Sequence, residues 1–251
     1  MLRRISKILF LPALIAVVWL TTRGSAAVVS STGYLQLSSK GQVYHVFKVD
    51  LTTDSIAFYW LDTLGQPLQT FQKLQSQTNQ KYRFITNGGM FHSDHSPVGL
   101  YVENGLQLRT IDTSKASGNF YLKPNGVFGM NGAKAWIGST ERYMSEYPTF
   151  RFGTQSGPML VIDNQIHSVF NEGSQNKYVR SGVGVDSSGV VVFVLSEAPV
   201  NFFDFATLFR NELHCSNALY LDGAISGMYC PEANLNSETD FGCMIAVLKR
   251  N

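Results

Sequence analysis

The residue types best suited to chemistry in this sequence stand where an apolar, strand-like run ends in a carboxylate. That run leads into Asp222 and Gly223, and Ser226 follows a few positions later. Small residues beside an acid leave room for a ligand, although Asp and Gly are also common in turns. A second carboxylate, Glu197, follows the apolar run 190–195. Two carboxylates at the ends of adjacent strands would suit glycosidic-bond cleavage, one as acid and the other as base or nucleophile, or would bracket a metal ion.

The segment Asn87-Gly88-Gly89 follows another strand-like run, and His92 comes shortly after it. Paired glycines let the backbone approach a ligand and expose successive N–H groups, which suit an anionic oxygen; the same pattern also forms a tight turn. His92 and His95, with Asp94 between them, would bind a metal ion or move protons, or would stand as ordinary surface residues. The segment lacks the spacing of a P-loop and of a dinucleotide-binding turn.

A serine and an arginine complete the set of candidates. Ser156, followed by Gly157 and a proline, comes just before the apolar run 159–162, which predicts a turn that leads into a strand. A serine hydrolase would place its nucleophile between a strand and a helix, so we expect Ser156 to act as a hydrogen-bond donor. Arg180 enters a small, apolar, glycine-rich run, where an unpaired guanidinium is costly. A structural carboxylate and a bound phosphate would satisfy Arg180 equally well.

Apolar runs predict many short strands and two helices that position these residues. Strands are predicted over 42–50, 56–61, 82–86, 98–103, 106–111, 127–131, 159–162, 165–169, 182–186, 190–195, 217–222 and 243–248. Helices are predicted over 67–79 and after a capping Asn201, where aromatic residues recur at helical spacing. The run 190–195 is apolar throughout, which is typical of a central strand buried on both faces. The pattern favours a single α+β domain of mixed β-sheets with a few packed helices.

The N-terminus and the charge balance predict an exported protein. A basic start, an apolar stretch and small residues are typical of a secretory signal peptide over 1–27, with the domain over 28–251. An uncleaved membrane anchor is the alternative, and membrane contact is expected only through that leader. The chain has 20 basic and 18 acidic residues, but 4 of the basic ones lie in the leader, so the remainder carries 16 − 18 = −2. No basic patch remains, which disfavours nucleic acid as a partner. We expect a secreted or periplasmic location.

Three cysteines, Cys215, Cys230 and Cys243, lie near the C-terminal end of the sequence. An oxidising compartment permits one disulfide among them, and a Cys215–Cys230 bridge would brace the segment that holds Asp222. Three buried thiols are the alternative. The spacing does not match a structural zinc site, so no metal ligands are assigned. No cofactor is predicted, although a divalent metal ion is left open.

Six segments, taken in order, resemble the phosphodiester glycosidase family, most of all its secreted bacterial branch. They are Asn-Gly-Gly-Met-Phe-His from residue 87, Ser-Pro-Val-Gly-Leu-Tyr from 96, Lys-Pro-Asn-Gly-Val-Phe from 123, Gln-Ser-Gly-Pro-Met-Leu from 155, Val-Arg-Ser-Gly-Val-Gly from 179 and Ala-Leu-Tyr-Leu-Asp-Gly from 218. The resemblance spans roughly residues 40–250 and implies hydrolysis of a sugar-1-phosphodiester similar to an N-acetylglucosamine-1-phosphodiester. Where members of the family carry further glycines after the Leu-Asp-Gly turn, this chain has Ala224 and Ile225.

We therefore expect an exported hydrolase of a sugar-1-phosphodiester, acting on a sugar phosphate or a cell-envelope glycan. The expected catalytic residues are Asp222, Arg180 and Glu197, and the expected substrate-binding residues are Asn87, Gly88, Gly89, His92, Ser156, Gly157, Gly223 and Ser226. A non-catalytic binding module for envelope glycans or phosphoglycopolymers is the main alternative, suggested by the departure at Ala224 and Ile225. A metal-dependent phosphodiesterase that uses His92, Asp94 and His95 is a third hypothesis.

Overall fold

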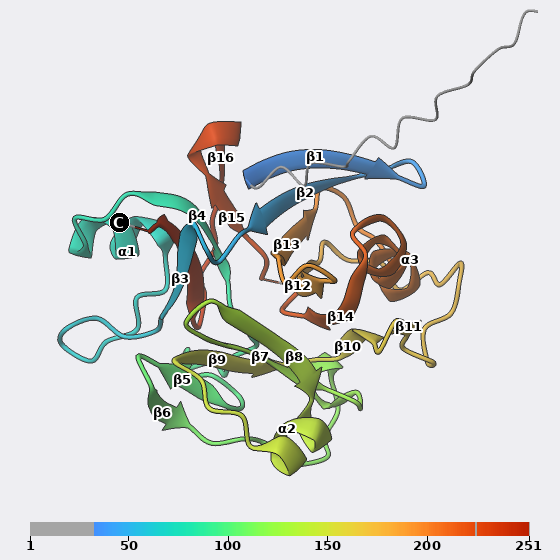
Figure 1. The fold of residues 1–251 in the computed structure, drawn as a ribbon, viewed down its shortest axis with the longest axis horizontal. Helices are drawn as coiled ribbons and strands as arrows, with labels where there is room; N and C mark the ends of the chain where they lie inside the picture. Colours follow the sequence, from blue (N-terminus) through green and yellow to red (C-terminus); the bar gives the residue numbers. More distant parts are fainter. Residues whose placement is uncertain (1–32, 224, 251) are drawn as a thin grey trace, which may run out of the picture. The chain divides into compact units, whose positions relative to one another are not determined.

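Three antiparallel β-sheets and a few short helices build the part of the chain that the structure describes (Figure 1). The computed structural model describes residues 33–223 and 225–250. The predicted signal peptide, residues 1–27, and the predicted domain boundary after it lie outside these residues, as does Ala224. No helix among the described residues is long and apolar enough to cross a membrane.

The largest sheet carries the strands that lead to Arg180 and Asp222, and we call it the seven-stranded sheet. In spatial order its strands are β1 (Gly33–Ser39), β2 (Gln42–Val49), β13 (Val191–Ser196), β12 (Ser181–Asp186), β14 (Cys215–Tyr220), β10 (Met159–Ile162) and β11 (Gln165–Ile166). The run predicted to be a central strand is β13, and every residue of β13 is buried. That prediction is confirmed, because core residues cover both faces of the sheet at this strand.

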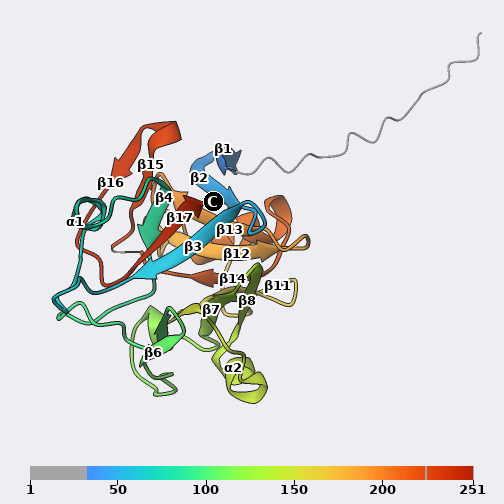
Figure 2. The ribbon, with the colours of Figure 1, turned by 60° about the vertical axis from the view of Figure 1, so that its left-hand side comes forward.

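Two five-stranded sheets complete the architecture. Figure 2 shows a strand of one of them, β3 (Asp54–Tyr59), together with β12, β13 and β14 of the seven-stranded sheet. The β4 sheet consists of β16 (Leu235–Ser237), β15 (Met228–Cys230), β4 (Tyr82–Asn87), β17 (Met244–Lys249) and β3 (Asp54–Tyr59). The β9 sheet consists of β6 (Leu106–Arg109), β5 (Tyr101–Glu103), β9 (Phe152–Ser156), β7 (Gly126–Asn131) and β8 (Lys134–Ser139). The expected α+β class with several sheets and few helices is confirmed.

The helices are short and lie at the surfaces of the sheets (Figure 1). They are α1 (Phe71–Gln77), α2 (Thr140–Glu146) and α3 (Phe202–Thr207), a π-helix η2 (Leu208–Glu212) and two 3₁₀ turns, η1 (Asn119–Tyr121) and η3 (Pro231–Ala233). Asn201 caps α3 as predicted, because its Oδ1 accepts the Asp204 N–H at 2.8 Å. The helix predicted over 67–79 is shorter than expected and begins after Thr70, whose hydroxyl caps it.

Two large buried layers hold the three sheets and α3 together, and two smaller clusters hold α1 and α2. Aromatic side chains from all three sheets meet in the first layer, where the rings of Phe47 and Phe84 stack with centroids 4.6 Å apart and Phe193 lies 5.3 Å from Phe84. The second layer lies between the seven-stranded sheet and α3, and contains Phe205 and Phe209. The strands of the seven-stranded sheet that lead to Arg180 and Asp222 lie between these two layers, so packing on both faces fixes their ends.

Candidate active site

The first residue of β12 and the segment after β14 lie side by side, which places Ser181 next to Asp222. The two strands pair antiparallel, with Gly182 opposite Tyr220. The ladder continues beyond the strand ends, since the Ser181 N–H donates to the Asp222 carbonyl at 2.9 Å and the Leu221 N–H donates to the Ser181 carbonyl at 3.0 Å. The backbone of Asp222 is therefore held by a continuous sheet although the residue itself follows the strand.

The Ser181 hydroxyl lies at the centre of a hydrogen-bonded cluster. Its Oγ is 2.9 Å from Asn87 Nδ2, 2.9 Å from the Asp222 carbonyl oxygen and 3.2 Å from Ser226 Oγ. Ser226 Oγ is also 2.8 Å from the Asp222 carbonyl oxygen. The structure thus brings together three predicted residues, Asn87, Asp222 and Ser226, through Ser181, which the sequence reasoning did not single out.

Ser156 adds the third sheet to this cluster. It is the last residue of β9, and its hydroxyl donates to the Leu221 carbonyl at 2.7 Å. Ser156 was predicted to lie in a turn before a strand; that part is wrong, because Gly157 and the following proline link the end of β9 to the start of β10. A Cβ at Gly157 would lie 2.9 Å from the Phe120 carbonyl oxygen, so close packing requires a glycine there. We call Asn87, Ser156, Ser181 and Ser226 the support cluster.

The side chain of Asn87 is fully engaged inside the protein. Its Nδ2 donates to Ser181 Oγ and to the Gly88 carbonyl at 3.1 Å, and its Oδ1 accepts the Gly227 N–H at 3.3 Å. The Gly88 N–H donates to the Cys243 carbonyl at 2.8 Å. The expectation that the Gly88 amide faces an anion is therefore wrong, because that N–H completes a backbone hydrogen bond. Asn87 acts as a positioning residue for Ser181.

The two glycines after Asn87 are required by close packing, Gly88 beside Cys243, just before β17 of the same sheet, and Gly89 against β9 of the neighbouring sheet. A Cβ at Gly88 would overlap Cys243 Sγ, and a Cβ at Gly89 would overlap the Gln155 carbonyl oxygen and lie 2.7 Å from Thr154 Oγ1. Gly88 thus fits the turn against its own sheet, and Gly89 lets the end of β4 approach β9 closely.

Asp222 presents its side chain on the opposite side of its backbone from Leu221. Leu221 is buried in the layer between the sheets, whereas Tyr220 is buried in the layer that contains α3. Successive side chains of an extended segment alternate between faces, so Asp222 shares the face of Tyr220. Burial raises the pKa of Tyr220 above its ordinary value, and the Asp222 charge adds to this effect while Arg180 opposes it. Asp222 is half-buried, as expected of a group that must meet a ligand.

Gly223 packs directly against this face. A Cβ at Gly223 would overlap the Tyr220 hydroxyl oxygen and would lie 3.2 Å from the Val179 carbonyl oxygen. The Gly223 N–H donates to Asp222 Oδ1 at 2.6 Å, which holds the carboxylate in one orientation. Glycine is therefore needed at position 223 for space, while its backbone N–H positions the carboxylate.

Arg180 is completely buried on the same face as Tyr220. Its Nε donates to the Val200 carbonyl at 2.7 Å, and its Nη2 lies 3.1 Å from the Asn176 carbonyl oxygen. Its Cζ lies 3.6 Å from the ring centre of Phe202 and 5.4 Å from that of Tyr220. Nη1 is buried and has no hydrogen-bond partner. Burial lowers the pKa of Arg180 from its ordinary value. The guanidinium is thus a fixed, buried cation beside the Tyr220 hydroxyl, and it has no carboxylate partner within hydrogen-bond distance among the residues described.

Ser196 holds the backbone of Arg180 in place. The Arg180 N–H donates to Ser196 Oγ at 2.9 Å, and the Ser196 N–H donates to the Arg180 carbonyl at 2.9 Å. Ser196, Ser181, Tyr220 and Phe202 are functional positions that sequence reasoning missed. The available signal was the period-two alternation of Val179 to Ser181, which places neighbouring residues on opposite faces.

Glu197 does not join Asp222. The two strands that lead to these carboxylates were expected to be adjacent, but β12 lies between β13 and β14, so that expectation is wrong. Glu197 is exposed, its N–H donates to the Val43 carbonyl at 3.0 Å, and its charge acts on Tyr34 and His45 of the neighbouring strands. A paired-carboxylate site is therefore not formed.

His92 also lies apart from the support cluster. It is exposed in a loop in which its N–H donates to the Ser96 carbonyl at 2.8 Å. The imidazole of His95 lies 3.2 Å from Gln69 Nε2, and the Asp94 carboxylate accepts the Ser96 N–H. No group of three His, Cys, Asp or Glu side chains arranged to hold a metal ion occurs among residues 33–223 and 225–250. The three cysteines are free, buried thiols, so the Cys215–Cys230 bridge is not formed.

Comparison with sequences of known families and proteins gives consistent matches. The model of the family described as phosphodiester glycosidase matches residues 80–244, which include the whole support cluster, Arg180 and Asp222. The chain is also 32% identical over 195 residues to the uncharacterised protein YigE of Escherichia coli (strain K12), covering 77% of this chain and 76% of YigE.

Solved structures share the fold at low sequence identity. The catalytic domain of zebrafish N-acetylglucosamine-1-phosphodiester α-N-acetylglucosaminidase, auto-inhibited by its pro-peptide, matches with a TM-score of 0.61 and 14% identity, covering 86% of this chain and 82% of that domain. A hypothetical protein from Synechocystis matches with a TM-score of 0.56 and 13% identity, covering 86% of this chain and 61% of that chain. These structures support the fold, and the family match extends over more than half of the sequence. The chain belongs to the phosphodiester glycosidase family.

Proposed function

We propose that this protein is an exported hydrolase that cleaves the bond between the anomeric carbon of a sugar and the oxygen of a phosphodiester. The observation that carries the proposal is the shared face of Asp222 and Arg180, whose charges both act on Tyr220, with the arginine held in a buried position. A carboxylate beside a fixed cation suits a substrate that carries both an electrophilic carbon and an anion. Membership of the phosphodiester glycosidase family supports the same class of substrate.

Arg180 would bind the phosphate. Its guanidinium is held by the Val200 and Asn176 carbonyl groups and by the Phe202 ring, so its orientation is set before the substrate arrives. A preorganised cation in a buried position stabilises the negative charge that grows on the departing phosphate. The free Nη1 group is the donor that we assign to a phosphate oxygen.

Asp222 would act at the anomeric carbon. As the bond from that carbon to the phosphate oxygen breaks, both bonding electrons leave with the phosphate monoester and positive charge develops on the sugar. The Asp222 carboxylate stabilises this charge and accepts a proton from the attacking water, whose hydroxyl bonds to the carbon. The proton then passes to solvent or to the released phosphate, so the products are a reducing sugar and a phosphate monoester. A phosphate monoester is a better leaving group than a sugar alkoxide, so one carboxylate suffices without Glu197.

The support cluster would keep Asp222 in position. Ser181 and Ser226 hold the Asp222 carbonyl, and Ser156 holds the preceding carbonyl. None of these hydroxyls needs to contact the substrate for this role. Export is supported by the signal-peptide pattern in residues 1–27 of the sequence.

The test is hydrolysis of a panel of sugar-1-phosphodiesters, in both anomeric forms, by the purified protein. We expect wild type and Asp163→Asn to release a reducing sugar and a phosphate monoester, because the Asp163 carboxylate is exposed and the Asp163 N–H bonds to the side chain of Asn217, five residues before Asp222 along the β14 segment and roughly 16 Å away. We expect Asp222→Asn to be inactive. Turnover by Asp222→Asn at the wild-type rate would exclude the assigned role. Saturable binding of a glycan with no product from any panel member would assign a binding module instead.

A further inference from the structure

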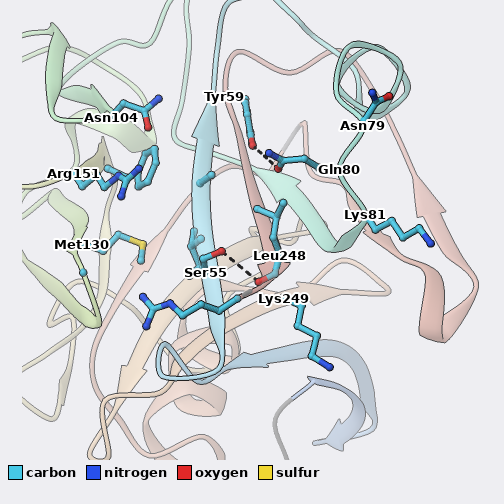
Figure 3. A pocket seen from close by; sticks show the side chains of 15 residues that line it. Ser55, Tyr59, Asn79, Gln80, Lys81, Asn104, Met130, Arg151, Leu248 and Lys249 are labelled. Atoms are coloured by element: carbon cyan, nitrogen blue, oxygen red, sulfur yellow. Dashed lines mark hydrogen bonds between the residues drawn. The ribbon is translucent and has the colours of Figure 1, made fainter.

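An open groove of about 800 Å³ lies along β3, the edge strand of the β4 sheet, and extends to the β9 sheet (Figure 3). Its lining includes Lys81, which directly precedes β4, whereas Asn87 of the support cluster is the last residue of β4. At about 3.3 Å per residue these two ends of the strand are roughly 20 Å apart. The groove is therefore separate from the candidate active site.

Four cationic residues and no acidic residue line the groove. They are Lys81, Arg151, Lys249 and Arg250. None of the four forms a salt bridge with any carboxylate among residues 33–223 and 225–250. This concentration does not follow from the composition, because the sequence after residue 27 carries a net charge of 16 − 18 = −2. Like charges that gather in a concave site without partners create a local field that attracts anions.

The cations are arranged for an extended ligand. In Figure 3, Arg151 and Asn104 lie on one side of β3, while Lys81, Gln80 and Lys249 lie on the other side. Backbone hydrogen bonds fix both sides, since the Arg151 carbonyl accepts the Gly105 N–H at 2.8 Å and the Arg250 N–H donates to the Thr53 carbonyl at 3.0 Å. A single phosphate would contact the cations on one side of β3 only, whereas a chain that crosses β3 would contact the cations on both sides.

The uncharged lining favours a polyol or sugar chain. Amide and hydroxyl side chains of Asn79, Gln80, Asn104, Ser55 and Tyr59 line the same groove and suit hydroxyl-rich ligands. Single-stranded nucleic acids are usually held on exposed aromatic faces. Here Phe152 is only 7% exposed, and the Tyr59 ring packs edge to face with Tyr82, so neither the Phe152 ring nor the Tyr59 ring is freely exposed for stacking.

We propose that this groove binds a linear chain of sugar or polyol units joined by phosphodiesters. The part of this proposal that concerns catalysis rests on the proposed function: the substrate is then a polymer, held at the groove while one end is hydrolysed near Asp222. The binding itself does not depend on turnover. Successive phosphates of the chain would contact Arg151 on one side of β3 and Lys81 and Lys249 on the other.

The experiment measures binding of synthetic poly(glycerol phosphate) to the purified protein at several salt concentrations. We expect tight binding of the polymer, weak binding of glycerol 3-phosphate and no binding of dextran. The triple variant Lys81→Gln/Arg151→Gln/Lys249→Gln should bind the polymer at least about tenfold more weakly. Its slope of log K against log salt concentration should be shallower by about 2, because each lost phosphate contact removes about 0.7.

A matched variant controls for net charge. Lys48→Gln/Lys115→Gln/Arg210→Gln also removes three positive charges, but none of the three lines the groove, so its affinity should stay near that of wild type. Equal weakening by both triple variants would overturn the proposal in favour of a diffuse charge effect. Tighter binding of a single-stranded oligonucleotide than of poly(glycerol phosphate) would overturn it in favour of nucleic acid. Absence of polymer binding would also overturn it, and the cations would then serve to keep the edge strand β3 from pairing with another strand.

The outcome is separable from that of the proposed function. Polymer binding is measured with both wild type and Asp222→Asn, and hydrolysis of a small sugar-1-phosphodiester is measured with the groove variant. If the groove proposal fails, the groove variant binds the polymer no more weakly than the matched triple variant, whatever the hydrolysis shows. If the proposed function fails, no small diester is hydrolysed, and the binding difference between the triple variants still stands.

Discussion

Arg180 and Ser181 are consecutive in the chain, yet their side chains act on opposite faces of the seven-stranded sheet. Arg180 packs on Phe202 in the layer that contains α3, whereas Ser181 bonds to Asn87 of the β4 sheet. The two residues therefore divide the candidate site into a reactive face and a support cluster behind it. Substitutions on the two faces should therefore differ in their effects on activity and on the free energy of unfolding.

Replacing Ser181 with alanine should reduce both stability and activity. The change leaves one N–H of the buried Asn87 amide without its partner, which costs about 1–3 kcal/mol in the free energy of unfolding. It also frees the Asp222 backbone, so we expect kcat to fall by about 10²-fold. Denaturant unfolding and steady-state kinetics measure the two effects. Ser188→Ala, in an exposed turn, should change unfolding by less than about 0.5 kcal/mol. An active, fully stable Ser181→Ala protein would show that the support cluster is dispensable.

Replacing Arg180 with lysine should remove phosphate recognition. Lysine retains a charge but cannot donate to the Val200 carbonyl and still present a second N–H in the plane of a fork. We expect kcat/KM for a sugar-1-phosphodiester to fall by about 10²–10³-fold. We expect inorganic phosphate, which resembles the phosphate monoester product, to inhibit wild type and not this variant. The exposed change Arg210→Lys should leave inhibition unaltered. Equal phosphate inhibition of wild type and Arg180→Lys would remove Arg180 from the binding role.

Gly223→Ala should inactivate the protein, and Tyr220→Phe should partly restore it. The added methyl group overlaps the Tyr220 hydroxyl, so the segment that carries Asp222 must move. Removing that hydroxyl leaves ring carbon Cζ at 3.1 Å, a contact that a small shift relieves. We therefore expect the double variant to be more active than Gly223→Ala. Activities of wild type, both single variants and the double variant form a cycle, and strictly additive losses would contradict this steric account.

Stability should decrease as the pH falls below about 6.5, the ordinary pKa of histidine. Burial lowers the pKa of His167, although the hydrogen bond with the Lys123 carbonyl opposes this effect. The unfolded chain then binds a proton that the folded chain does not, so the free energy of unfolding falls by up to about 1.4 kcal/mol per pH unit for this group. Burial also lowers the pKa of His45, which adds in the same direction. Denaturant unfolding from pH 7.5 to pH 5 should show a shallower dependence for His167→Gln than for wild type. An unchanged dependence would assign the effect to other groups.

Local patterns in the sequence predict several elements correctly because local forces determine them. The continuous apolar run of β13 requires burial on both faces, and the Asn201 cap defines the start of α3. The carboxylate after β14 was a good candidate for the same reason, since a strand end beside Gly223 is a local feature. Its proximity to Asn87 and Ser226 follows from sheet pairing, and the structure shows it.

Other features depend on pairing that no local pattern encodes. Glu197 and Asp222 both follow apolar strands, and the position of β12 between those strands separates them. The strand β9 was missed because all of its residues are buried although several are polar or glycine, so it shows no alternation. Ser156 is the last residue of β9, so the position of its hydroxyl beside the Leu221 carbonyl depends on that strand. The role of Ser181 was hidden since its partners come from elements remote in the sequence.

The hydrogen bond between Asn87 and Ser181 joins two residues that are 94 positions apart in the chain and belong to different sheets. Asp222 adds a strand that follows both in the chain. A nascent polypeptide therefore cannot assemble the site until the segment beyond Asp222 has been synthesised and has paired. Recovery of hydrolysis during refolding would consequently report completion of the whole tertiary structure, and N-terminal fragments that stop before Asp222 would contain no partial version of the catalyst.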